Sequence, residues 1–136
     1  PQLPAAVELV AMMPEQPFVL DHLAKPRIKA GSLDPWQADI RALARHPHVS
    51  CKLSGLVTEA AWQSWKRADF TPYLEVALDA FGPKRLMMGS DWPVCLLAAE
   101  YPDVVGIVTD FIGRLSESEQ DLILGETATR VYRLRH

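Results

Sequence analysis

The chain has 136 residues, of which 49% are hydrophobic and 23% are charged, and its 14 basic and 17 acidic side chains give a formal net charge of −3. This composition excludes a disordered chain, because the apolar residues are numerous enough to form a core, and no stretch approaches the ~20 apolar residues that a transmembrane helix needs. A slightly acidic chain without a basic cluster also lacks the charge that dominates nucleic-acid binding, so neither a nucleic acid nor a membrane is an expected partner.

Short apolar runs alternate with amphipathic stretches along the whole chain. Helical periodicity predicts helices over 3–14, 34–46, 70–81 and 104–115, and two shorter helices that begin near residues 116 and 127. Asp69 and Thr127 are predicted to cap helix starts, and Ser116 with Glu119 has the spacing of a capping box. Buried strands are predicted at 18–20, 49–53 and 85–89.

These strands are separated by segments that each contain a helix, which is the pattern of successive βαβ units with parallel pairing. The fold class is therefore α/β, with about three parallel strands and their helices. A complete eight-stranded barrel needs ~250 residues, so the length allows one domain and excludes a whole barrel.

Candidate functional residues follow from the rule that parallel sheets place their chemistry beyond the carboxyl ends of the strands. Side chains alternate between the two faces of a strand, so extending that alternation past each strand end places His22, Lys52 with Ser54, and Asp91 on one face at one end. We expect His22 and Asp91 to open onto a common cavity, with Lys52 between them.

Each of these residues also has a purely structural interpretation. His22 could be a hydrogen-bonded structural residue, and Lys52 could extend its amine to solvent from a strand end. Asp91, which stands before Trp92 and a proline, could form an Asx-turn. The convergence of three polar groups at one sheet end favours a functional site.

Three motifs carry a family resemblance: Asp21-His22-Leu23-Ala24-Lys25-Pro26, Lys52-Leu53-Ser54-Gly55 and Gly89-Ser90-Asp91-Trp92-Pro93. In this order and spacing they resemble the carboxyl-terminal half of the amidohydrolase-related family. The resemblance is closest to its branch of sugar-lactone and dicarboxylate-lactone hydrolases, which includes L-fuconolactonase-like and L-rhamnonolactonase-like proteins. The closing segment 124–132 also resembles the family's last helix, with Thr127 where asparagine is usual.

The resemblance implies the carboxyl-terminal part of a TIM-type (β/α)₈ metal-hydrolase barrel, with residues 1–136 forming a single partial domain that supplies strands six to eight. It implies Asp91 as the general base on water and His22 as the group that polarises the substrate carbonyl, and both as ligands if a divalent metal of the zinc type is bound. The family's His-x-His pair belongs to the amino-terminal half, and a metal-independent reaction is the alternative. Lys52, Lys25, Ser54 and Trp92 are the predicted substrate-binding residues.

The predicted function is hydrolysis of a sugar lactone or a carboxylated lactone by base-activated water. The alternatives are a metal-dependent non-oxidative decarboxylase of the same superfamily, which would use the same acid, and an inactive truncated fragment. Two cysteines without a leader segment favour a cytoplasmic location. Open sheet edges predict self-association as the further interaction, besides the small-molecule substrate.

Overall fold

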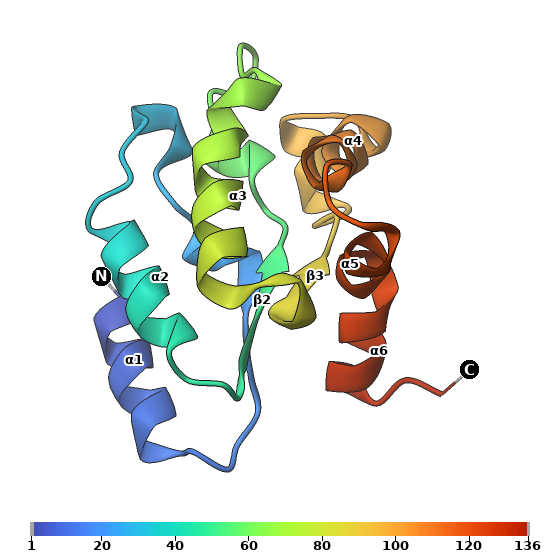
Figure 1. Cartoon of the computed structure of the whole chain (residues 1–136). Coiled ribbons are helices and arrows are strands. Elements are labelled where there is room, and N and C mark those ends of the chain that lie inside the picture. Colours follow the sequence, from blue (N-terminus) through green and yellow to red (C-terminus); the bar gives the residue numbers. More distant parts are fainter. Residues whose placement is uncertain (1, 136) are drawn as a thin grey trace.

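The computed structural model describes residues 2–135, which fold around one three-stranded parallel sheet (Figure 1). The order along the sheet is β1-β2-β3, so β2 is central and each outer strand pairs only with β2. The predicted strands and their parallel pairing are confirmed, and the bounds are β1 Phe18–Leu20, β2 Val49–Leu53 and β3 Leu86–Met88.

Helices follow the strands in the predicted order. In Figure 1, α1, α2 and α3 stand side by side next to β1 and β2, whereas α5 and α6 lie beyond β3. A π-helical segment, 122–126, joins α5 to α6 in one continuous helical run. The bounds are α1 Leu3–Met12, α2 Trp36–Ala44, α3 Arg67–Phe81, α4 Tyr101–Ile112, α5 Glu117–Asp121 and α6 Thr127–Tyr132.

The core lies between the sheet and the helices. Val49, Cys51 and Leu53 alternate along β2 and are all buried, as the strand parity predicts. Phe70 and Leu74 on α3 are buried in the same apolar cluster. Lys52, on the opposite face of β2, is the one residue of this strand that is not buried, so this face is partly open near the carboxyl end of the strand.

The two predicted helix caps at Asp69 and Thr127 are wrong. α3 begins at Arg67, and the Asp69 carboxylate accepts the Lys66 backbone N–H at 2.8 Å, so it satisfies an N–H from inside the first turn. Thr127 stands inside the continuous helical run and is fully buried, and its hydroxyl is directed at the carbonyl oxygens of Pro83 and Lys84. The predicted capping box at Ser116 is confirmed, because the Glu119 carboxylate accepts the Ser116 N–H.

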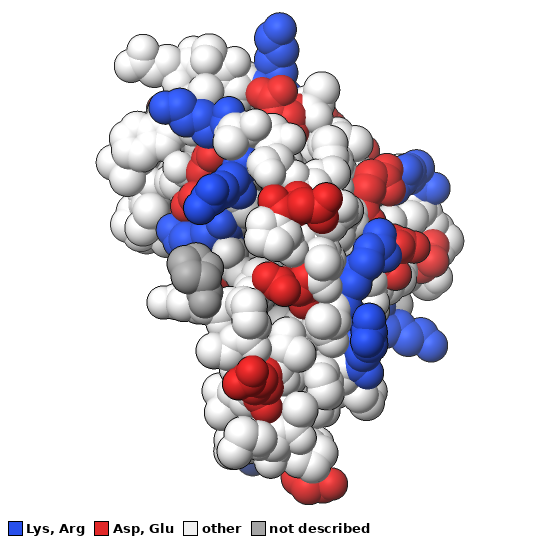
Figure 2. Space-filling view, turned by 90° about the vertical axis from the view of Figure 1, so that its left-hand side faces the viewer, with Lys and Arg blue, Asp and Glu red and all other residues white. Residues whose placement is uncertain are grey.

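The surface carries charges of both signs. Figure 2 shows Lys and Arg beside Asp and Glu on the face that it presents. Within residues 2–135 no helix is long and apolar enough to cross a membrane.

Candidate active site

His22 is positioned by an unusual turn that begins where β1 ends. Residues 22–25 all have positive φ, with His22 at +49°, so the extended backbone stops at Leu20 and the chain turns through four left-handed residues. This conformation costs non-glycine residues roughly 1–2 kcal/mol each. Packing opposes that cost, because Leu23 is fully buried and its carbonyl oxygen accepts the Trp36 indole N–H at 2.7 Å. Backbone strain of this kind is typical of functional sites.

Asp91 is placed in a similar way after β3. It has a φ of +59°, and its carbonyl oxygen accepts the Cys95 N–H at 2.9 Å, which starts the turn that follows. Its side chain is 13% exposed. The carboxylate therefore stands at the carboxyl end of the sheet in a fixed, mostly enclosed position.

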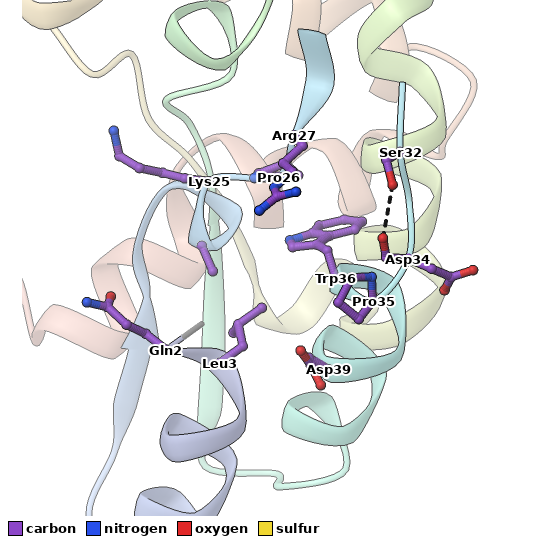
Figure 3. A pocket seen from close by; sticks show the side chains of 11 residues that line it. Gln2, Leu3, Lys25, Pro26, Arg27, Ser32, Asp34, Pro35, Trp36 and Asp39 are labelled. Atoms are coloured by element: carbon purple, nitrogen blue, oxygen red, sulfur yellow. Dashed lines mark hydrogen bonds between the residues drawn. The ribbon is translucent and has the colours of Figure 1, made fainter. Parts of the chain in front are cut away.

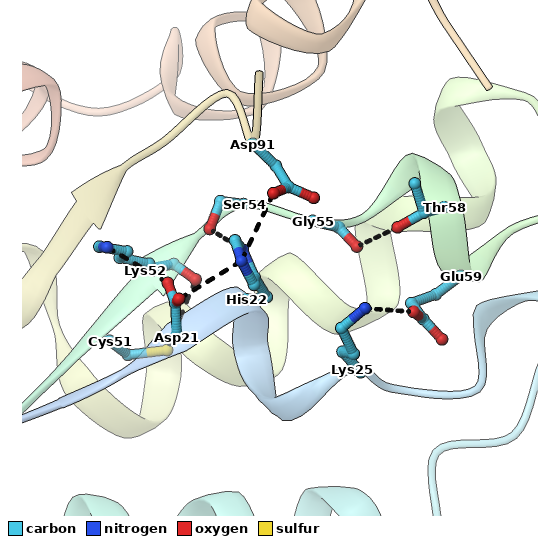
Figure 4. A network of polar contacts seen from close by, with 10 residues as sticks. All are labelled: Asp21, His22, Lys25, Cys51, Lys52, Ser54, Gly55, Thr58, Glu59 and Asp91. Carbon is cyan, nitrogen blue, oxygen red and sulfur yellow. Dashed lines mark hydrogen bonds and ion pairs between the residues drawn. The ribbon is translucent and has the colours of Figure 1, made fainter. Parts of the chain in front are cut away.

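The imidazole of His22 joins these elements (Figure 4). Its Nδ1 lies 2.8 Å from the Ser54 hydroxyl. Its Nε2 lies 3.3 Å from Asp21 Oδ2 and 3.5 Å from Asp91 Oδ1. The structure thus brings His22 and Asp91 together, as the strand parity predicts, although their strands do not pair with each other.

Lys52 lies on the predicted face but does not lie between His22 and Asp91, which contact each other directly. Its ammonium is 3.2 Å from Asp21 Oδ1 and 5.6 Å from the centre of the Tyr132 ring. Burial lowers the pKa of Lys52, but the neighbouring side chains of Tyr132 and Asp21 outweigh burial and raise this pKa above its ordinary value. Lys52 therefore stays charged at neutral pH.

The other predicted substrate-binding residues have varied surroundings. The Lys25 ammonium lies 3.2 Å from the Glu59 carboxylate. Trp92 directly follows Asp91 in the chain and is 63% exposed, so its ring is accessible from solvent. Ser54 is only 3% exposed, and its hydroxyl is directed at His22. Of this group, Ser54 is thus the residue least accessible to a substrate.

Asp21 and Tyr132 are the site neighbours that the sequence reasoning missed. Asp21 contacts both His22 and Lys52, so it links two of the predicted residues. It directly follows β1, and the strand-end rule that selected His22 could have selected it as well. Tyr132 comes from α6, and no local signal in the sequence connects that helix with β2.

A metal site needs more ligands than this cluster supplies. Within residues 2–135 no group of three or more His, Cys, Asp or Glu side chains could hold a metal ion. Zinc in a catalytic site takes three protein ligands as a rule. The residues described therefore do not make a complete zinc site by themselves.

A separate pocket of roughly 380 Å³ lies beside the left-handed turn, between the starts of α1 and α2 (Figure 3). Neither His22 nor Asp91 lines it. Its walls mix charged, polar and apolar side chains, which include Lys25, Arg27, Asp34, Trp36 and Asp39. It is distinct from the His22 cluster.

The sequence and the fold match one class of protein. The Amidohydrolase family model matches residues 1–134, and the chain belongs to that family. The family resemblance predicted from the motifs is therefore confirmed, and the fold is the carboxyl-terminal part of a TIM-type barrel.

Among curated proteins, the chain is 47% identical to an L-fucono-1,5-lactonase of Burkholderia multivorans over 98% of its own length and 48% of the relative's. It is 43% identical to an L-fucono-1,5-lactonase of Burkholderia ambifaria over 74% of its length and 34% of the relative's. The chain thus spans at most about half the length of these relatives.

Solved structures show the same likeness. An amidohydrolase of Burkholderia multivorans, crystallised with bound zinc, superposes with a TM-score of 0.94 at 46% identity and covers 98% of this chain and 50% of its own. Amidohydrolase 2 of Bifidobacterium longum subsp. infantis superposes with a TM-score of 0.78 at 24% identity, over 98% of this chain and 46% of its own, and supports the fold alone.

Proposed function

We propose that this protein contributes the carboxyl-terminal half of the active site of a lactone hydrolase, with a sugar lactone of the L-fucono-1,5-lactone type as substrate. The observation that carries the proposal is the contact between His22 Nε2 and Asp91 Oδ1 at the carboxyl end of the sheet. The similarity to two proteins named L-fucono-1,5-lactonase supports it. Residues 1–136 would then be one partial domain of a barrel.

In this proposal Asp91 is the general base and His22 is the electrophile. The carboxylate accepts a proton from water, whose oxygen attacks the lactone carbonyl carbon. The Nε2–H of His22 donates a hydrogen bond to the carbonyl oxygen as negative charge develops there. The ring C–O bond then breaks, the ring oxygen takes up the proton, and the product is a hydroxy acid.

Lys52 and Lys25 are the proposed contacts for the substrate's hydroxyl or carboxylate groups, and Trp92 would form a wall of the site. Lys52 is the stronger candidate, because its ammonium lies in the same polar cluster as His22. Ser54 fits a substrate contact less well, because it is buried behind the imidazole.

His22 and Asp91 are also the two side chains that could contribute to a divalent metal site, since Nε2 and Oδ1 point at each other from 3.5 Å. The remaining ligands would have to come from outside residues 2–135. A bound zinc would acidify a water molecule. No step proposed for Asp91 or His22 requires it.

The test is a chimera in which the amino-terminal half of the Burkholderia multivorans L-fucono-1,5-lactonase precedes residues 1–136. We expect the chimera to hydrolyse L-fucono-1,5-lactone, measured as acid release with a pH indicator. Residues 1–136 alone should stay at the background rate, because a half barrel does not enclose the substrate. The intact Burkholderia enzyme is the positive control.

A folded chimera without lactonase activity would contradict the proposal and favour the inactive fragment. Release of carbon dioxide from a carboxylated substrate without lactone hydrolysis would favour the decarboxylase instead. The lactonase relatives favour neither alternative.

A further inference from the structure

The hydroxyl of Ser54 lies directly behind the imidazole of His22. Ser54 follows the last residue of β2, is 3% exposed, and places its Oγ 2.8 Å from Nδ1. The hydroxyl is thus shielded from solvent and committed to one ring nitrogen. A hydroxyl can either donate or accept a hydrogen bond, and the Ser54 hydroxyl donates only if Nδ1 carries no hydrogen. Because a neutral imidazole carries one hydrogen, the groups that face Nε2 decide which nitrogen holds it.

Those groups are two carboxylates. Asp21 Oδ2 lies 3.3 Å and Asp91 Oδ1 lies 3.5 Å from Nε2. An ionised carboxylate only accepts hydrogen bonds, so two of them facing Nε2 favour a hydrogen on this nitrogen. In the neutral imidazole Nδ1 is then unprotonated and accepts, and Ser54 is the donor.

The glycines around Ser54 fit this arrangement closely. A Cβ at Gly55 would lie 2.7 Å from the Cβ of His22 and 2.9 Å from its Nδ1, and Gly55 has a φ of +64°. A Cβ at Gly89 would lie 3.1 Å from the Cβ of Ser54. A side chain at Gly55 would therefore collide with His22, and one at Gly89 would press on Ser54.

We propose that Ser54 is a positioning residue which donates its hydroxyl hydrogen to Nδ1 and so holds His22 in the tautomer that carries its hydrogen on Nε2. Gly55 and Gly89 leave the space for this contact. The inference rests on the proposed function, because an Nε2–H that can donate to the lactone carbonyl oxygen is what the electrophile of lactone hydrolysis requires. It assigns Ser54 to the imidazole instead of to the substrate.

The experiment is nitrogen-15 NMR of the imidazole rings in the full chain, with the His22 signals assigned by their loss in His22→Gln. We expect the neutral imidazole of wild-type His22 to show a protonated Nε2 and an unprotonated Nδ1, as one tautomer. Ser54→Ala should give shifts averaged between both tautomers. Ser50→Ala, another buried serine on the same face of β2, is the matched control and should leave the His22 signals unchanged.

A second pair of variants tests the packing. Gly55→Ala should displace the ring and remove the single-tautomer signature while the Ser54 hydroxyl is retained. Gly31→Ala is its control, because Gly31 has the same φ of +64° but nothing within 4 Å of an added Cβ. Backbone amide spectra establish that each variant is folded, and if Gly55→Ala does not fold, Ser54→Ala decides.

Two outcomes would overturn the positioning role: a wild-type His22 with its hydrogen on Nδ1, or a Ser54→Ala spectrum identical to wild type. Both are independent of turnover. A chimera that hydrolyses no lactone while His22 keeps the Nε2–H tautomer would instead contradict the proposed function and leave the role of Ser54 in place.

Discussion

His22 Nε2 lies 3.5 Å from Asp91 Oδ1, although the two residues come from opposite outer strands of the sheet. Both have positive φ, so the chain turns sharply at His22, shortly after β1, and at Asp91, shortly after β3, and the two side chains meet at the carboxyl end of the sheet. The site therefore depends on two strained turns as much as on the strands.

Replacement of Asp91 by asparagine tests the general base. Asp91→Asn keeps the shape of the side chain but removes its basicity, so we expect the chimera to lose roughly 10²-fold or more in kcat. Stability should change little, because asparagine tolerates the φ of +59° at this position better than most residues do. Initial rates and thermal melts measure the two effects, and Asp121→Asn on α5 is the control. Retained turnover in Asp91→Asn would exclude Asp91 as the base.

Lys52 offers a test that separates binding from chemistry. The pKa of Lys52 is raised, because Tyr132 and Asp21 outweigh the effect of burial, so it carries its charge at neutral pH. If it binds the substrate, Lys52→Met in the chimera should raise KM by about tenfold with little change in kcat. Lys29→Met, at an exposed lysine outside the cluster, should change neither. A fall in kcat at constant KM would mean that Lys52 acts by holding Asp21.

The architecture could be predicted from the sequence because it depends on local patterns. The apolar runs of the three strands and the glycine at the end of α3 are strong signals, and strand parity predicts that His22 and Asp91 lie at one end of the sheet, where the structure places them. Gly82 ends the helix with a φ of +67°, which glycine adopts without strain.

The details that could not be predicted depend on tertiary contacts. Strand parity assumes an extended backbone from Leu20 to His22, but the backbone at His22 is left-handed. Trp36, from another element, donates its indole N–H to the Leu23 carbonyl oxygen in this turn, and the sequence does not predict that contact. The partner of Lys52 is Asp21, a residue of the preceding strand end. Thr127 has the sequence of a cap, but its hydroxyl is buried against the segment that precedes β3.

Thr127 predicts a measurable loss of stability. Its hydroxyl is directed at two carbonyl oxygens, both at 3.4 Å, and it is fully buried. Thr127→Val removes the donor and keeps the shape, so we expect the free energy of unfolding to fall by about 1 kcal/mol. The control is Thr109→Val on α4, where the hydroxyl bonds within its own helix. Urea denaturation measures both, and equal effects would contradict a specific role for Thr127.

Both cysteines should be unreactive in the native protein. Cys51 and Cys95 are fully buried. Burial raises the pKa of both thiols, and the nearby carboxylates Asp21 and Asp91 raise the pKa of Cys51 and Cys95 respectively. Since the thiolate is the reactive form, labelling with a disulfide reagent at about pH 8 should be slow until denaturant is added, when both should react. Rapid labelling of the native chain would show that the core opens readily.

The sheet itself predicts self-association of residues 1–136. β1 and β3 each pair only with β2 among the residues described, so both outer strands present unpaired backbone groups. Large apolar side chains that follow β3 are also exposed, with Trp92 at 63% and Leu97 at 60%.

Sedimentation velocity measures this self-association. We expect the average mass to rise with protein concentration, and the rise to remain in high salt, because salt does not screen edge pairing and apolar contacts as it screens charges. The chimera supplies neighbours for both strands, so it should sediment with less dependence on concentration than residues 1–136. A monomer at every concentration for residues 1–136 would show that these edges are protected within the chain.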